Sequence, residues 1–440
     1  MSIEIIPVGG FSEIGRNCVA IKVDDEIVIL DMGLHLENYI NHTEGAEFDD
    51  ITDMSEKILI DVDAVPNIRV LDKLKKNVVG IFISHAHLDH VGAVPFLAKN
   101  FKCPVYGTPF TIQVLKALIR DNKVNFKNKL VAKKQNSRFK ISKNIEIEFL
   151  SVTHSTPQTV IIVVHTKYGS IAYANDVKLD DNPMIGEKTN LKRLKKLKIK
   201  ALFLNCLYST TPGHTDSESV PANELKHFFL DNNHNKKNMF LTTFSSQIAR
   251  IKTVKELAIK MGRKPVFLGR SLAKYTCAAQ DVKLADFSDV KIVKYSSKVK
   301  KFLSTLPNPE KCLFIVTGNQ GEPNATLSKI VYENYFDFKR GDIVIFSCTV
   351  IPVQENVENR SRLEQALKSK GVNVYKDIHA SGHARQEDHK TFLRLIKPEY
   401  VLPLHGDRHR MRKMKEIAVN EGINKDKILM LRNNERISIN

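Results

Sequence analysis

The chain has 440 residues, 42% of them hydrophobic, which is enough for two or three domains with cores of their own. It has no apolar run long enough to cross a membrane and no signal peptide at its start, so we expect a cytoplasmic protein. Its six cysteines lack C-x-x-C spacing. We therefore predict that they are buried apolar residues, and we assign them neither a metal nor a disulfide.

The net charge of +18 is the main compositional indication of a partner. An excess of this size favours a polyanion such as nucleic acid, because each neutralised phosphate releases counterions. A strongly basic cytosol, which raises the charge of all its proteins, is the alternative. The densest basic run, residues 192–200, has leucines three positions apart. We interpret it as an amphipathic helix with a solvated basic face rather than as a binding motif.

The first half of the chain alternates short β-rich segments with turns and helices, which predicts a layered α/β domain. Residues 35–67 are rich in Asp, Glu and Asn and are predicted to form a surface insertion. The predicted strands are residues 4–8, 18–23, 26–30, 78–84, 146–151 and 159–165, and the predicted helices are residues 91–100, 110–121 and 191–198.

From about residue 212 the pattern changes to apolar strands separated by helices, which predicts a small parallel sheet in a second α/β module. The predicted helices are residues 222–231, 247–261 and 358–370, and the predicted strands are residues 238–243, 265–269, 312–317 and 342–348. The last helix would lead back to a final portion rich in histidine. The sequence thus predicts one α/β module inserted into another, with divisions at residues 1–208, 209–355 and 356–440.

The most informative segment is residues 81–90, IFISHAHLDH. An apolar strand-like run leads directly into four potential metal ligands, which can converge only if the chain turns sharply after the strand. A helix is expected to start at Val91. Histidine and carboxylate ligands suit Zn²⁺ best, and Mn²⁺ is also possible. The four residues are His85, His87, Asp89 and His90.

Four residues cannot complete a site for two metal ions, so we looked for further ligands at the ends of predicted strands. His154, Asp176 and His405 each follow such a run, and a strand end holds a ligand rigidly. Asp31 also follows an apolar strand and could accept a hydrogen bond from a ligand imidazole. A turn-capping role for Asp31 before Gly33 fits the local sequence equally well.

The chain resembles the β-CASP branch of the metallo-β-lactamase nucleases, and within that branch the ribonuclease J family. The resemblance spans almost the whole sequence. The chain ends soon after the last motif, so we expect it to lack the additional C-terminal domain of bacterial members and to be similar to the archaeal ones. The motifs that carry the resemblance are residues 8–17 (VGGFSEIGRN), 85–90, 269–271 (GRS), 317–323 (TGNQGEP), 379–384 (HASGHA) and 404–406 (LHG).

The resemblance implies a metallo-β-lactamase αββα sandwich, formed by residues 1–208 and 356–440, with a β-CASP α/β domain inserted at residues 209–355. It implies two Zn²⁺ ions, single-stranded RNA as substrate and a homodimer. One ion would be held by His85, His87 and His154 and the other by Asp89, His90 and His405, with Asp176 bridging them. Asp89, His383, Asn205 and Asp31 would take part in catalysis, and His379, Ser381, Gly382, Ser245, Ser246 and Arg270 would contact RNA phosphates, together with the 318–322 segment.

Asn205 departs from the family pattern. An Asp or Glu normally follows the strand at residues 201–204 and is thought to stabilise the charged form of the catalytic histidine, here His383. An amide keeps the hydrogen-bonding geometry but removes the charge, so the His383 imidazolium should be less favoured. We therefore expect slower turnover with metal and RNA binding retained. An engineered inactivating change would explain the same residue.

Three functions are compatible with the sequence. The leading hypothesis is a ribonuclease that uses two metal ions and degrades RNA from its 5′ end, with some endonuclease activity possible. The second is a non-catalytic or weakened RNA-binding member of the same family, motivated by Asn205. The third is a hydrolase of small esters or thioesters, a common use of this fold. The inserted module, the charge of +18 and the 379–383 motif argue against the third hypothesis.

Overall fold

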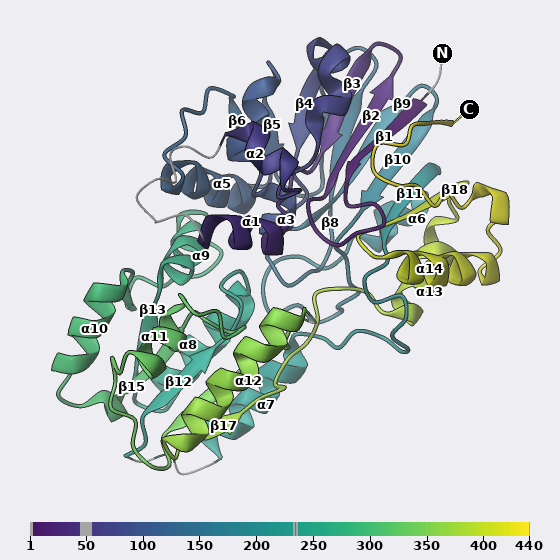
Figure 1. The fold of residues 1–440 in the computed structure, drawn as a ribbon. Helices are drawn as coiled ribbons and strands as arrows, with labels where there is room; N and C mark the ends of the chain where they lie inside the picture. The colour runs from purple at the N-terminus through teal and green to yellow at the C-terminus, as the bar shows by residue number, and fades with distance from the viewer. Residues whose placement is uncertain (1–2, 45–54, 232–233, 235, 352, 440) are drawn as a thin grey trace. The chain divides into compact units, whose positions relative to one another are not determined.

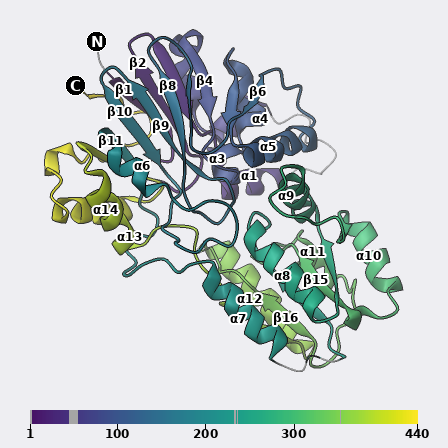
Figure 2. The same ribbon diagram turned by 180° about the vertical axis from the view of Figure 1, so that it is seen from behind.

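The computed structural model of the chain describes residues 3–44, 55–231, 234, 236–351 and 353–439. Contacts in space between residues divide the chain into two compact units (Figures 1 and 2). No helix within these described ranges is long and apolar enough to cross a membrane. Unit 1 comprises Met1–Asp181, Glu187–Thr215 and Gly382–Asn440, and unit 2 comprises Asn182–Gly186 and Asp216–Ser381.

Unit 1 contains two sheets of mixed strand direction. In spatial order the first contains β19 (Ile437–Ile439), β1 (Ile3–Gly9), β2 (Cys18–Val23), β3 (Glu26–Leu30), β4 (Val78–Phe82), β5 (Val105–Gly107) and β6 (Leu130–Ala132). The second contains β18 (Tyr400–Leu404), β11 (Ile199–Asn205), β10 (Gly169–Ala174), β9 (Val160–Thr166), β8 (Glu146–Ser151) and β7 (Ser137–Lys140).

The two sheets of unit 1 pack face to face. Alternate residues of a strand point to opposite faces of its sheet, so one set of apolar residues can face the other sheet while the next set faces outward. On β9, Val160, Ile162 and Val164 face a core cluster shared with the first sheet. The intervening Ile161 and Val163 face a second cluster, which helices complete on the outer side of the second sheet. The result is the αββα sandwich that the family resemblance implied, a metallo-β-lactamase fold.

Helices cover the outer faces of both sheets of unit 1, and α6, α13 and α14 contribute buried residues to the second cluster (Figure 1). The helices are α1 (Leu36–Glu44), α2 (Glu56–Asp61), α3 (Leu88–Val91), α4 (Val94–Leu97), α5 (Pro109–Asp121), α6 (Leu191–Lys196), α13 (Gln386–Ile396) and α14 (Arg408–Asn420). Of the predicted insertion at residues 35–67, α1 and α2 are seen, and residues 45–54 lie outside the described residues.

Unit 2 is built on one parallel sheet, as its apolar strand pattern predicted. In spatial order it contains β14 (Lys291–Val293), β13 (Lys264–Leu268), β15 (Cys312–Val316), β12 (Met239–Thr242), β16 (Ile343–Phe346) and β17 (Asn373–Tyr375). The helices are α7 (Ser219–Leu230), α8 (Ile248–Lys260), α9 (Arg270–Asp281), α10 (Ser296–Thr305), α11 (Thr326–Tyr332) and α12 (Gln354–Ser369).

The contacts place α12 in unit 2, so this unit extends past residue 355, where the sequence-based division ends the inserted module. Leu363 and Leu367 of α12 are fully buried in the apolar cluster of unit 2. The amphipathic pattern of α12 predicts a helix with a buried face, but it does not say which sheet that face covers.

Two local predictions were wrong, and one predicted helix is shorter than expected. The helix predicted to start at Val91 instead begins at Leu88 as α3 and is followed by the separate helix α4, which has a proline in its first turn. The basic helix ends at Lys196, because Leu197 is extended and leads into β11. Cys277 is exposed, whereas the other five cysteines are buried as predicted.

Candidate metal centre

The candidate ligands all lie at the same edge of the unit 1 sandwich, where its strands end. In the second sheet β10, β11 and β18 run parallel, so the residues that follow them meet at one edge. In the first sheet β3 and β4 run parallel and end in the same way. These strand ends, with the loop after β8, gather His85, His87, Asp89, His90, His154, Asp176 and His405.

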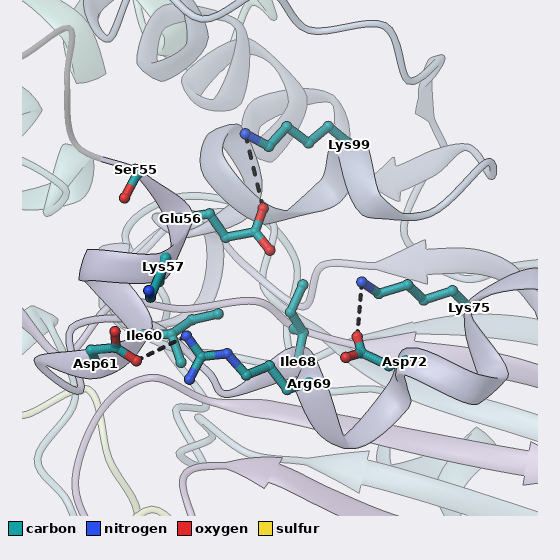
Figure 3. Close-up of a pocket in the computed structure, with 10 residues that line it drawn as sticks. All are labelled: Ser55, Glu56, Lys57, Ile60, Asp61, Ile68, Arg69, Asp72, Lys75 and Lys99. Carbon is teal, nitrogen blue, oxygen red and sulfur yellow. Dashed lines mark ion pairs between the residues drawn. The ribbon is translucent and has the colours of Figure 1, made fainter.

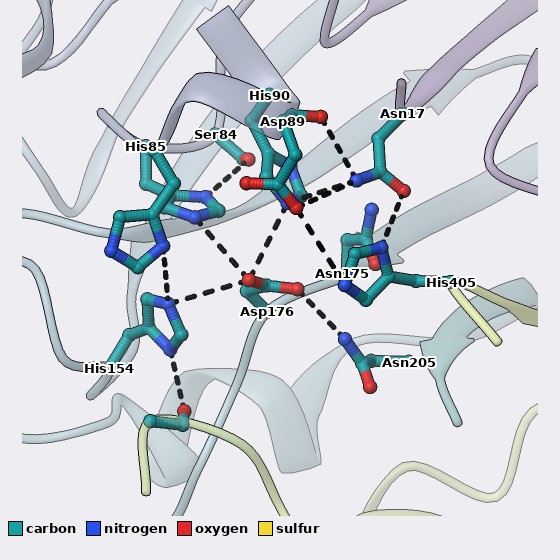
Figure 4. Close-up of polar contacts among 12 residues, drawn as sticks. Asn17, Ser84, His85, Asp89, His90, His154, Asn175, Asp176, Asn205 and His405 are labelled. Carbon is teal, nitrogen blue, oxygen red and sulfur yellow. Dashed lines mark hydrogen bonds and ion pairs between the residues drawn. The ribbon is translucent and has the colours of Figure 1, made fainter. Parts of the chain in front are cut away.

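The seven side chains form two groups with Asp176 between them (Figure 4). His85, His87, His154 and Asp176 form one group, and Asp89, His90 and His405 form the other; within each group the possible ligand atoms lie within 4.8 Å of one another. Asp176 Oδ2 lies 3.4 Å from both His85 Nε2 and His154 Nε2, and 3.5 Å from His90 Nε2 in the other group.

Hydrogen bonds fix the tautomers of the histidines. His90 Nδ1 donates to Asp31 Oδ2 at 2.7 Å, and His154 Nδ1 donates to the carbonyl of Gly382 at 2.5 Å. Because these acceptors take the Nδ1 proton, the lone pair of each imidazole in its neutral form is on Nε2 and points toward the centre. Asp31 also accepts from Ser84 N at 2.7 Å and so joins the ends of β3 and β4, whereas Gly33 N of the local turn donates to the carbonyl of Asn17.

Burial keeps most of these imidazoles neutral. It lowers the pKa of His87 to about 3 and that of His405 to about 4. It also lowers the pKa of His154 well below its usual value, and burial together with the neighbouring His90 lowers that of His85. Neutral imidazoles are the form that binds metal ions.

The carboxylates of the centre are ionised. Burial raises the pKa of Asp176, but the His383 and His90 imidazoles outweigh burial and hold that pKa well below its usual range. Asp89 is held low in the same way, chiefly by His90. For His90 burial is opposed by the surrounding carboxylates, with Asp89 first, and its pKa lies well above the usual value.

This donor set fits metal ions. His85 Nε2 is buried and has no hydrogen-bond partner among the described residues, although a buried nitrogen of this kind normally has one. Its lone pair, the neutral imidazoles around it and the ionised Asp176 and Asp89 form a mixed nitrogen and oxygen site, which is typical of zinc and also accepted by manganese.

Asn17 is a contributor that the sequence reasoning did not assign, although it lies in the quoted motif at residues 8–17. It is fully buried, and its Nδ2 donates to the backbone oxygen of Asp89 at 3.0 Å. Its Oδ1 accepts from His405 Nδ1 at 3.1 Å. Gly15 N lies farther from this nitrogen, at 3.5 Å, so we assign the Nδ1 proton to the bond with Asn17. Asn17 thereby orients two candidate ligands of the second group.

The backbone at the centre is strained and tightly packed. Asp31 and His405 adopt φ values of 59° and 55°, a left-handed conformation that side chains other than glycine rarely take. At Gly33 a Cβ atom would lie 1.6 Å from the backbone oxygen of Asp89. Only glycine fits there, and its close approach sets the position of Asp89.

Replacing Gly33 by alanine is expected to destabilise unit 1 by about 3 kcal/mol and to weaken zinc binding, because the segment with Asp89 and His90 must move. Thermal denaturation and zinc titration by calorimetry measure the two effects. Gly107→Ala is the matched control, since its Cβ would meet side-chain carbons of Thr111 and Ile112 and approach none closer than 3.2 Å. A Gly33→Ala protein with the stability and zinc affinity of the parent would contradict this account.

His383 and Asn205 lie beside Asp176. Asn205 Nδ2 donates to Asp176 Oδ1 at 2.8 Å and lies 3.4 Å from His383 Nδ1, which itself is 3.8 Å from the same carboxylate oxygen. Asn205 Oδ1 accepts from Leu207 N at 2.8 Å, which fixes the amide orientation. The side of Asn205 that faces His383 is therefore a hydrogen-bond donor, and it cannot accept a hydrogen bond from the His383 imidazolium.

The predicted RNA contacts of unit 2 share one edge of its sheet. Ser245 and Ser246 follow β12, Arg270 follows β13 and the 318–322 segment follows β15, all of which are parallel. His379 and Ser381 follow β17, which continues the same sheet. Ligands of open α/β sheets bind at this carboxyl edge. The remaining residue of the set, Gly382, belongs to unit 1.

A hollow of about 730 Å³ lies elsewhere in unit 1, between α2, the 3-10 helix Ile68–Asn77 and Lys99 (Figure 3). Most of its charged side chains pair with one another, as in the Arg69–Asp61 ion pair of 2.8 Å and the Lys75–Asp72 ion pair of 2.9 Å. Because these charges offset each other, nothing in the lining selects a ligand, and we assign the hollow no function.

Comparison with known proteins decides the family. A ribonuclease J of Methanocaldococcus jannaschii is 38% identical over 100% of this chain and 99% of its own length. The chain belongs to the ribonuclease J family. A ribonuclease J of Pyrococcus abyssi is 39% identical over 96% of this chain and 93% of its own length. One of Helicobacter pylori is 29% identical over the full chain, which corresponds to 61% of that protein.

Family models agree with this assignment. Residues 58–218 match the beta-lactamase superfamily domain, residues 236–362 the ribonuclease J beta-CASP domain, and residues 369–427 the Zn-dependent metallo-hydrolase RNA specificity domain. The crystal structure of a protein of unknown function from Enterococcus faecalis V583 has the same fold, with a TM-score of 0.66 and 17% identity over both full chains. The chain is therefore a metal-dependent ribonuclease, as its motifs indicated.

Proposed function

We propose that this ribonuclease degrades single-stranded RNA from a 5′-monophosphate end toward the 3′ end, with some endonuclease activity, and so acts in RNA decay or processing. The observation that carries the proposal is the pair of ligand groups joined by Asp176, next to His383. Membership of the ribonuclease J family supports RNA as the substrate.

We assign two Zn²⁺ ions to the centre, with Mn²⁺ as the alternative. One ion would be held by His85, His87 and His154, and Asp176 would bridge it to the other. When bound, such a pair lowers the pKa of a water molecule and neutralises charge on the phosphate. The second ion would be held by Asp89, His90 and His405.

The chain's own residues orient the ligands and move the proton. Asp31 holds the ring of His90, and the carbonyl of Gly382 holds that of His154. His383 is our candidate to protonate the leaving ribose oxygen, which is too basic to depart unprotonated. His379, Ser381 and Gly382 would bind a neighbouring phosphate of the RNA.

Unit 2 would contribute RNA contacts of its own. Ser245, Ser246 and Arg270 lie at the carboxyl edge of its sheet, together with the glycine-rich 318–322 segment. Backbone amides of glycine-rich turns and small hydroxyl side chains suit phosphate oxygens, and the exposed Arg270 adds charge. The net charge of +18 is consistent with such a surface.

RNAs labelled at either end test the direction and the end preference. With Zn²⁺ or Mn²⁺ added, we expect labelled mononucleotide to be released at once from 5′-labelled monophosphate RNA, and 5′-triphosphate RNA to be degraded much more slowly. Internal fragments of both RNAs at equal rates would instead indicate an endonuclease. Early release of a 3′-terminal mononucleotide would contradict the proposed direction.

Asn205 motivates a second candidate, a catalytically weakened member of the family that mainly binds RNA. Its donor side faces His383, so the charged form of His383 lacks an acceptor at this position. Turnover of 5′-monophosphate RNA separates the two candidates. Tight RNA binding without turnover, in protein shown to contain metal, would favour the second candidate.

We also propose that the protein is a homodimer, on the basis of the family resemblance. Light scattering coupled to gel filtration measures the mass directly, and the chain mass is 49.9 kDa. A mass near twice this value across a range of protein concentrations is expected. A single-chain mass throughout would exclude the dimer.

A further inference from the structure

The predicted phosphate-binding segment is also a connection between the two units. The main body of unit 2 is joined to unit 1 between Thr215 and Asp216 and again between Ser381 and Gly382. His379, Ser381 and Gly382, which we assign to RNA binding, therefore lie on the second connection. Residues that hold the two ends of this connection therefore also determine the conformation of its phosphate-binding residues.

In unit 2 the guanidinium of Arg250 binds a residue beside each of the two connections. Arg250 of α8 is fully buried, and its Nε and Nη2 atoms bind the two carboxylate oxygens of Glu218 at 2.5 and 2.9 Å. Its Nη1 donates to the carbonyl of Ile378 at 3.0 Å. Glu218 follows the first connection and Ile378 precedes His379, so Arg250 joins the start and the end of the unit.

The Arg250 anchor is tied to the sheet of unit 2. Ser347, which follows β16, accepts from Arg250 Nη1 at 2.6 Å, and its hydroxyl donates to the carbonyl of Ile378 at 2.8 Å. Ser347 N in turn donates to the carbonyl of Thr242 on β12 at 2.8 Å. The carbonyl before His379 is thus held by two donors whose positions the sheet determines.

Unit 1 holds the other ends in the same way. Asp388 of α13 is buried, and its Oδ2 accepts from Thr215 N at 2.9 Å and from Arg385 N at 3.0 Å. The Thr215 hydroxyl donates to the carbonyl of His383 at 2.7 Å. The residue before the first connection is therefore bound to the residues just after the second.

We propose that Arg250 and Asp388 are positioning residues, which fix the two ends of the 379–382 segment and so present its backbone and side chains to RNA. The proposal rests on the assignment of this segment to RNA binding. A guanidinium has the planar fork needed to bind a carboxylate and a carbonyl together, and lysine lacks it. Arg250→Lys should therefore keep the charge and lose the geometry.

The test compares Arg250→Lys with Arg263→Lys. Arg263 is a buried arginine of the same unit that binds the carbonyls of Lys237 and His234, at 2.8 and 2.6 Å, away from the connections. Four measurements are compared: the thermal midpoint, hydrogen exchange of the peptide that spans residues 376–384, affinity for a 2′-O-methylated 5′-monophosphate oligoribonucleotide without added metal, and KM and kcat for cleavage of the unmodified oligoribonucleotide with Zn²⁺.

We expect Arg250→Lys alone to speed exchange in residues 376–384 and to weaken RNA affinity roughly 10-fold, with KM raised more than kcat is lowered. Arg263→Lys should lower the thermal midpoint without either effect. Equal behaviour of the two variants would overturn the proposal. Faster exchange with unchanged RNA affinity would show that Arg250 does position residues 379–382. It would overturn the assignment of these residues to RNA binding.

Two further variants keep the test decisive if Arg250→Lys fails to fold. Ser347→Ala removes only one of the two donors to the Ile378 carbonyl, and we expect a smaller change of the same kind. Asp388→Asn weakens the anchor of unit 1. Its control is Asp342→Asn, because Asp342 is a buried carboxylate of unit 2 that accepts from Asn238 N at 3.0 Å. No change with Ser347→Ala and Asp388→Asn would overturn the proposal.

Discussion

Asp176→Asn is expected to lower RNA cleavage by about 1,000-fold or more and to reduce bound zinc from two ions to one or fewer. Asp176 Oδ2 is within 3.5 Å of imidazole nitrogens from both ligand groups. An amide of the same shape keeps the packing but removes the negative charge. Cleavage assays and metal analysis of the dialysed protein measure the two effects.

Two comparisons isolate the role of the carboxylate in that experiment. Asp31→Asn should give a milder loss, about 10- to 100-fold in metal affinity, because Asp31 is not itself a candidate ligand and acts through its hydrogen bonds to the ring of His90 and to Ser84. Asp342→Asn, in unit 2, changes an equally buried carboxylate and should leave zinc content unchanged. Two zinc ions retained by the Asp176→Asn protein would exclude the bridging role.

The gathering of candidate ligands could be anticipated from sequence because each follows an apolar run. A strand that is buried must end at an edge of its sheet, and parallel strands end at the same edge, so His154, Asp176 and His405 were placed correctly relative to β8, β10 and β18. The strand periodicity that carried this reasoning is local. It therefore also located β12, β13, β15 and β16 of unit 2, but not the short edge strands β14 and β17.

Features that depend on distant contacts could not be anticipated. The start of α3 at Leu88 is set by hydrogen bonds from Met32 N to the His90 carbonyl and from Leu34 N to the Leu88 carbonyl, which join separate parts of the chain. Asn17 acts on Asp89 and His405, which are 72 and 388 residues away. Local propensities carry no information on such pairs.

Asn205 shows how the structure sharpened an expectation. From the sequence alone, an amide at this position is expected to keep the hydrogen-bonding geometry of a carboxylate and to lose only its charge. In the structure the Asn205 amide nitrogen faces both Asp176 and His383, so the acceptor is lost as well as the charge. A protonated His383 would have its Nδ1 proton directed at another donor. Transfer of a proton to the leaving oxygen should therefore be disfavoured twice.

Asn205→Asp is accordingly expected to raise kcat by roughly 10- to 100-fold at neutral pH, and to extend activity to higher pH, because a carboxylate can accept from His383 and stabilise its charged form. A second carboxylate would also stand beside Asp176 Oδ1, now 2.8 Å from Asn205 Nδ2, so zinc affinity should rise as well. Single-turnover rates across a pH series and zinc titrations measure both effects.

A double-mutant cycle with His383→Ala shows whether the gain acts through this histidine. If it does, Asn205→Asp should give no increase in the His383→Ala background. Asn175→Asp is the matched control for added charge, because Asn175 is equally buried but donates to the Tyr173 hydroxyl at 2.9 Å instead. An equal gain from Asn175→Asp would attribute the effect to charge in general. Unchanged cleavage by the Asn205→Asp protein would remove Asn205 as the cause of slow turnover, and with it the structural argument for a weakened enzyme.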